Sequence, residues 1–155
     1  MEWTTLAATG LGAFVGVGST LLADRVRRHH DLAERTRQER KEIYVACLTK
    51  YRQAYEDMYA AASRPPEGVA RETAVHEAFR ASGCDEVRES ALICAPQELS
   101  DVIERVYETL RDLLDVLAGG EPPLDSPEFQ ERRLQHGRAV WAARTAMRRD
   151  LGLRD

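Results

Sequence analysis

The sequence LSDVIERVYETLRDLLDVL, residues 99–117, carries the most regular apolar pattern in the chain. Large apolar residues recur there in steps of four, three, four, three and four, at Leu99, Ile103, Val106, Leu110, Leu113 and Leu117. This spacing is that of one face of an α-helix, and Gly119-Gly120 marks its end. The stretch therefore predicts an amphipathic helix whose apolar face is buried against other helices.

Similar patterns on either side predict further helices. One face of the stretch before Pro65 is formed by Tyr44, Cys47, Leu48, Tyr51, Tyr55, Met58, Tyr59 and Ala62. A second helix is expected over about 69–94, with Gly83 as a point where it bends or splits. Ser126-Pro127 begins a last helix, whose apolar face is formed by Phe129, His136, Val140, Ala143, Met147 and Leu151. Short connections between such helices predict an all-α fold, with an up-and-down bundle of about four helices over 43–153.

Residues 3–23 contain no Asp, Glu, Lys or Arg. A helix of about 20 residues is about 30 Å long, the thickness of the hydrocarbon core of a bilayer. A cleaved signal peptide and a buried core helix are the alternatives, but no basic residue precedes the segment and no charged face interrupts it. We therefore expect a transmembrane helix over 3–23. Small residues share one face of it, and we expect this face to be a self-association surface, formed by Ala8, Gly12, Gly16 and Thr20.

Seven basic residues follow this segment between positions 25 and 41. The positive-inside rule then places the N-terminus outside the cell membrane and the C-terminal domain in the cytoplasm. The first three of them, Arg25, Arg27 and Arg28, are expected to contact lipid headgroups. Residues 24–42 are almost wholly polar and pair opposite charges at helical spacing, which predicts a charged juxtamembrane helical stalk that continues the transmembrane helix.

The sequence offers no catalytic constellation. It has no G-x-S-x-G, no glycine-rich phosphate loop with a following Lys-Ser or Lys-Thr, and no E-x-x-H of the di-iron bundles. Cys47, Cys84 and Cys94 lack the spacing of a metal site and are expected to be buried thiols. A net charge of −4 argues against a general nucleic-acid binder. We expect no enzyme, no catalytic residue, no metal or cofactor, and no small-molecule substrate.

Three features leave alternatives open. Leu134 and Trp141 lie off the apolar face of the last helix, so they either widen the buried face or form an exposed partner surface. The tyrosine stripe at 44, 51, 55 and 59 either packs in the core with hydroxyls at the rim or lines a pocket. The net charge is −4 over 97–118 and +3 over 128–155, so these two flanks either pair with each other or are solvated separately.

Several pieces of the chain carry a family resemblance: KEIY at 41–44, ALICAP at 91–96 and MRRDLGL at 147–153. With its glycine-rich N-terminal segment and Arg/Glu-rich following helix, the chain resembles a group of small bacterial single-pass membrane proteins of uncharacterised function. The resemblance covers most of the chain. It implies an N-terminal anchor with a cytoplasmic helical bundle, and it carries over no catalytic or binding residue.

These observations lead to an expected function. The chain is expected to be a membrane-tethered, non-enzymatic interaction or scaffold module, with the lipid bilayer as one partner. Its bundle would self-associate as a homo-oligomer or dock a protein partner. The alternative is an oligomerising membrane-active effector, whose anchor forms a pore or leak controlled by the bundle.

Overall fold

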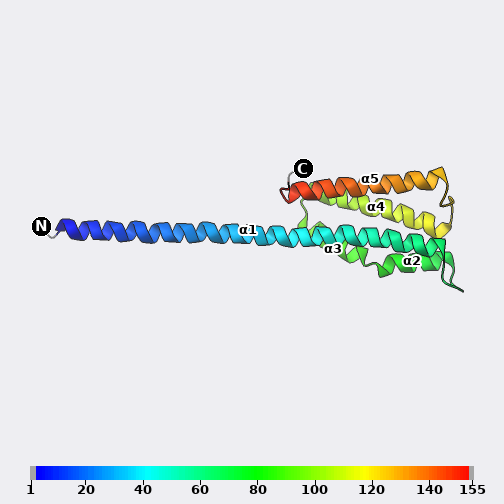
Figure 1. Ribbon diagram of the computed structural model, residues 1–155, viewed down its shortest axis with the longest axis horizontal. Coiled ribbons are helices and arrows are strands. Elements are labelled where there is room, and N and C mark those ends of the chain that lie inside the picture. The colour runs from blue at the N-terminus through cyan, green and yellow to red at the C-terminus, as the bar shows by residue number, and fades with distance from the viewer. Residues whose placement is uncertain (1–2, 154–155) are drawn as a thin grey trace. The chain divides into compact units, whose positions relative to one another are not determined.

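The computed structural model describes the backbone of residues 3–153 and the side chains of residues 31–153. This part of the chain forms five helices and no strand (Figure 1). The helices are α1 (Trp3–Ser63), α2 (Arg71–Ala81), α3 (Cys84–Cys94), α4 (Gln97–Gly119) and α5 (Pro127–Asp150). The prediction of an all-α helical bundle is confirmed.

The chain divides into two compact units, Met1–Glu39 and Arg40–Asp155. In the first unit residues 3–39 are helical, and nearly all the side chains described there, those from residue 31 onward, are exposed. The second unit contains the buried core and is called the bundle below. It consists of residues 40–63 of α1 together with α2, α3, α4 and α5.

The predicted architecture of a transmembrane helix followed by a bundle needs correction. Within the described part of the chain, no helix is long and apolar enough to cross a membrane. The prediction rested on the absence of charge over 3–23, but 13 of these 21 residues are Gly, Ala, Ser or Thr. Such residues carry little apolar surface, so the segment is uncharged without being strongly apolar. The pore-forming alternative required the same helix.

The side-chain predictions that fall on this segment lie outside the described residues. They are the self-association face of Ala8, Gly12, Gly16 and Thr20, and the headgroup contacts of Arg25, Arg27 and Arg28. The sequence predicted a charged stalk over 24–42 and a separate first helix of the bundle after it. In the structure both belong to one continuous helix, α1.

The helix expected over 69–94 is two helices. Gly83 separates α2 from α3 with a φ of +68°, in the left-handed region that favours glycine. Ser82 stabilises the break, because its hydroxyl donates to the Phe79 carbonyl and accepts from the Cys84 backbone N–H. Both bonds are local and buried, so the chain changes direction here without leaving polar groups unpaired.

The bundle follows an up-and-down path with its second arm split at Gly83. The Tyr44 hydroxyl bonds Asp150 and the Tyr59 ring lies 6.3 Å from that of Phe129, so α1 and α5 are antiparallel. Arg71 of α2 contacts Leu117 and Arg88 of α3 contacts Glu104, so both run antiparallel to α4. Figure 1 shows α4 and α5 side by side, also antiparallel.

The apolar face of α4 lies at the centre of the core. All six of its predicted positions are buried: Leu99, Ile103, Val106, Leu110, Leu113 and Leu117. They pack with Tyr51 and Met58 of α1 and with Phe129 and Met147 of α5. Burying one such leucine contributes about 1.5–3 kcal/mol, so this face supplies much of the favourable free energy of folding.

Replacing Leu110 by Ala should lower the free energy of unfolding by about 2–5 kcal/mol, because it leaves a cavity under a fully buried side chain. The matched control is Leu134→Ala in α5, where the leucine is 51% exposed and the expected change is within about 0.5 kcal/mol. Urea unfolding followed by circular dichroism measures both. Equal losses in the two variants would contradict the assignment of α4 as the core helix.

Candidate binding groove

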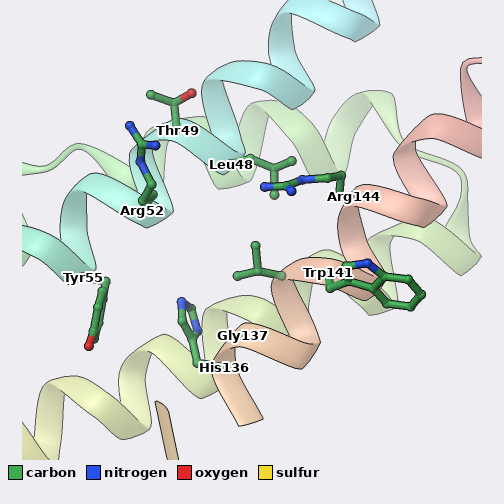
Figure 2. A pocket seen from close by; sticks show the side chains of 9 residues that line it. Leu48, Thr49, Arg52, Tyr55, His136, Gly137, Trp141 and Arg144 are labelled. Atoms are coloured by element: carbon green, nitrogen blue, oxygen red, sulfur yellow. The ribbon is translucent and has the colours of Figure 1, made fainter. Parts of the chain in front are cut away.

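A groove of about 470 Å³ runs between α1 and α5 within the bundle (Figure 2). It is lined by Leu48, Thr49, Arg52 and Tyr55 of α1 and by His136, Gly137, Val140, Trp141 and Arg144 of α5. Gly137 helps to open it, because a Cβ placed there would meet nothing within 4 Å. We call this feature the α1–α5 groove.

The position of Trp141 follows from the way α5 packs. Phe129, Ala143 and Met147 are buried in the core, and this fixes the rotation of α5 about its axis. Trp141 is then 68% exposed and projects from the rim of the groove on the side away from α1 (Figure 2). Leu134 is also exposed but does not line the groove. These two side chains therefore do not widen the buried face, and their role as a partner surface stays a prediction.

The two charged residues that line the groove, Arg52 and Arg144, are both positive. Residues 132–149 of α5 contain six arginines and no acidic residue. Arg144 extends from α5 toward the α1 side of the groove in Figure 2, and within residues 31–153 it has no ion-pair partner. Arg52 lies on the α1 side, and among the described side chains its only ion pair is an exposed one with Glu56 at 3.5 Å, which contributes about 0–1 kcal/mol. The α1–α5 groove therefore favours an anionic occupant.

His136 contributes a neutral hydrogen-bonding group to the groove. It is only 7% exposed, and this burial lowers its pKa to about 4. Its Nδ1 lies 3.0 Å from the Thr109 hydroxyl, which donates to the Val106 carbonyl. With the single Thr109 hydroxyl hydrogen directed at Val106, Nδ1 is assigned as the donor of the pair and Nε2 as the acceptor.

Tyr55 is the member of the tyrosine stripe that lines the groove. Its ring lies 6.0 Å from that of His136, and burial raises the pKa of its hydroxyl, which stays protonated. Tyr44 and Tyr51 are buried in the core, and Tyr59 lies at its edge, where its ring is close to Phe129. Tyr55 thus lines a pocket, whereas Tyr44 and Tyr51 pack in the core, and the Tyr51 hydroxyl is buried there and not at the rim.

Three ion pairs on the acidic flank of α4 and the basic flank of α5 do not join these two helices. Glu104 binds Arg88 of α3, and Glu108 binds Arg105 of its own helix. On α5, Arg132 binds Glu128 one turn away. The basic flank of α5 borders the groove at Arg144.

Two of the described cysteines are buried, and the groove offers contact surface and charge. Cys47 and Cys84 are buried, and burial raises the pKa of Cys47 to about 11 and that of Cys84 as well, so neither forms the reactive thiolate near neutral pH. No group of His, Cys, Asp or Glu among the described side chains could hold a metal ion. What the groove offers is an apolar floor at Leu48 and Val140 with cations along its edges.

Sequence reasoning did not identify Arg52, Gly137 and Arg144 as groove residues. A glycine in the middle of a long helix was the available signal, because Gly costs about 0.5–1 kcal/mol there relative to Ala. The two arginines gave no signal of their own, since which helix faces α5 was not fixed by the sequence pattern.

No protein-family model, curated protein or solved structure matches the chain. The likeness to small bacterial single-pass membrane proteins therefore stays an expectation from the sequence.

The stability of the bundle should depend on pH through His136. Its pKa in the folded protein, about 4, is lower than the ordinary 6.5, so the unfolded chain binds the proton more readily. The contribution of neutral His136 to the free energy of unfolding is fully present above pH 6.5. It is lost as the pH falls toward 4, and the free energy of unfolding decreases by up to about 3 kcal/mol. His136→Gln, which does not titrate, is the reference.

The measurement is the free energy of unfolding of both proteins between pH 7.5 and pH 4. Wild type should lose stability faster than His136→Gln below about pH 6.5. Parallel curves for the two proteins would show that His136 is solvated and not buried beside Thr109.

Proposed function

We propose that residues 40–153 form a non-enzymatic helical interaction module, which docks an acidic helical segment of a protein in the α1–α5 groove. The observation that carries the proposal is Trp141, which is largely exposed at the rim of a groove whose charged lining is entirely arginine. Tryptophan and arginine are the residue types most enriched among those that dominate binding energy at protein interfaces.

The apolar floor favours a helical segment as the occupant. Two antiparallel helices leave a shallow channel between them, and an amphipathic helix fits such a channel with its apolar side chains inward. Leu48 and Val140 offer apolar contact area in the channel, and Trp141 offers more at its rim. Half-buried Tyr55 and neutral His136 add hydrogen-bonding groups without adding charge.

The charges favour an acidic segment. Arg144 has no ion-pair partner within residues 31–153, and Arg52 has only the exposed Glu56. A carboxylate near either guanidinium gains an ion pair at little desolvation cost, whereas a basic segment meets like charge. Binding should therefore weaken as salt is added.

The chain provides its own reporter for this proposal. It contains two tryptophans, Trp3 and Trp141, so Trp3→Phe leaves Trp141 as the single source of indole fluorescence. A designed amphipathic helix with a leucine face and glutamates at its edges should shift this emission to the blue. The same peptide with Gln in place of Glu should bind about tenfold more weakly, because two ion pairs are lost at up to about 1 kcal/mol each.

Gly137→Met serves as the matched variant, because its side chain enters open space in the groove and also relieves the cost of glycine in a helix. It should fold at least as stably as wild type and abolish the fluorescence response. Equal binding of the Glu and Gln peptides, or no response to either, would contradict the proposal.

A further inference from the structure

The bundle carries a surface whose chemistry complements the α1–α5 groove. On α3, four exposed residues share one face by their spacing of three, one and three: Glu86, Glu89, Ser90 and Ile93. Ile93 is 83% exposed, more than any other large apolar side chain described. We call this surface the α3 face.

The α3 face is acidic as well as apolar. Glu86 has no ion-pair partner within residues 31–153. Glu89 lies 2.7 Å from Arg88, but the same guanidinium holds both carboxylate oxygens of Glu104. One arginine thus serves two carboxylates, and with Glu86 the surface keeps a net negative charge.

The α3 face does not lie at the groove of its own molecule. Asp85 accepts a hydrogen bond of 2.6 Å from the Tyr107 hydroxyl, and with the Arg88–Glu104 contact this holds α3 on α4. The groove lies between α1 and α5, and Figure 1 shows α3 and α5 on opposite sides of α1. An occupant with this chemistry must therefore come from another molecule.

We propose that the α1–α5 groove receives the α3 face of a second copy of this chain. Ile93 of one copy packs against Trp141 and Val140 of the other, and Glu86 and Glu89 approach Arg52 and Arg144. The inference rests on the proposed docking function and names its occupant. It pairs the most exposed aliphatic side chain of the bundle with its exposed tryptophan, and joins carboxylates to arginines that have weak partners or none.

The dimensions of the two surfaces agree. Glu86 and Ile93 are seven residues apart, about 10 Å along the helix axis. The groove residues on α5 extend from His136 to Arg144, eight residues or about 12 Å. Two turns of α3 therefore match the length of the groove.

This interface joins two different surfaces, so it is heterologous. A pair of molecules leaves one groove and one α3 face unused, and association continues into a ring or an open chain. This property separates the proposal from a symmetric dimer, in which both copies use the same surface.

The test uses two full-length variants with complementary defects. Trp141→Ser with Arg144→Glu destroys the groove, and Ile93→Ser with Glu89→Arg destroys the α3 face. All four side chains are solvent-accessible, and unchanged thermal unfolding shows that each variant still folds. Light scattering after size-exclusion chromatography gives the mass of each variant and of their mixture.

Wild type should associate to masses that rise with concentration and fall with added salt. Each variant alone should be monomeric, and their mixture should form one-to-one dimers and nothing larger. The matched control, Leu134→Ser with Arg138→Glu, alters an exposed leucine and an arginine of α5 outside the groove and should associate as wild type does.

Monomeric wild type, a mixture that stays monomeric, or association by either variant alone would overturn the second copy as occupant. If wild type is monomeric while Trp141 emission still responds to the acidic peptide, the proposal of a second copy as the occupant is wrong, but the proposed docking function is not. If the emission does not respond either, the docking function fails with it.

Discussion

Burial of the apolar face of α4 is the constraint on which the bundle depends. α2, α3 and α5 all contact α4, and Tyr51 of α1 brings its ring to 6.4 Å from Tyr107. Because the six large residues of this face must be buried together, every neighbouring helix turns its own apolar side toward α4. The residues of these helices that do not contact the core then form the outer surface of the bundle.

The groove is a consequence of that packing. α5 uses Phe129, Ala143 and Met147 for the core, so Gly137 and Arg144 face outward beside α1. At its C-terminal end α5 is fixed to α1 by Asp150, which accepts hydrogen bonds from Tyr44 at 2.9 Å and from Arg40 at 3.2 Å. The walls of the groove are therefore held in place by the core and by this partly buried polar contact, and the side chains that line the groove are available to a partner.

The sequence predicted those features that depend on one helix alone. Periodicity alone located the face from Leu99 to Leu117, and Ser126 was recognised as the N-cap that accepts from the Phe129 N–H. Gly83 was seen as a break, but whether it would bend or split a helix depends on tertiary packing. Predicting the groove would have required knowing that Leu48 of α1 faces Val140 of α5. The apolar pattern of a single helix does not say which other helix it packs against. The prediction of a transmembrane helix over 3–23 was wrong because an uncharged segment was taken to be strongly apolar.

The central claim is that the groove is an interaction surface with Trp141 and Ile93 on opposite sides of one interface. Nuclear Overhauser spectroscopy on an equal mixture of chains tests it most directly, with one chain labelled at the isoleucine methyl groups and the other unlabelled. When the labelled chain is deuterated everywhere except at its isoleucine methyl groups, only contacts between two copies give a signal from such a methyl to an indole proton. The account predicts such a signal between Ile93 and Trp141, lost in the Gly137→Met protein. Its absence at concentrations where the chain is associated would contradict the account.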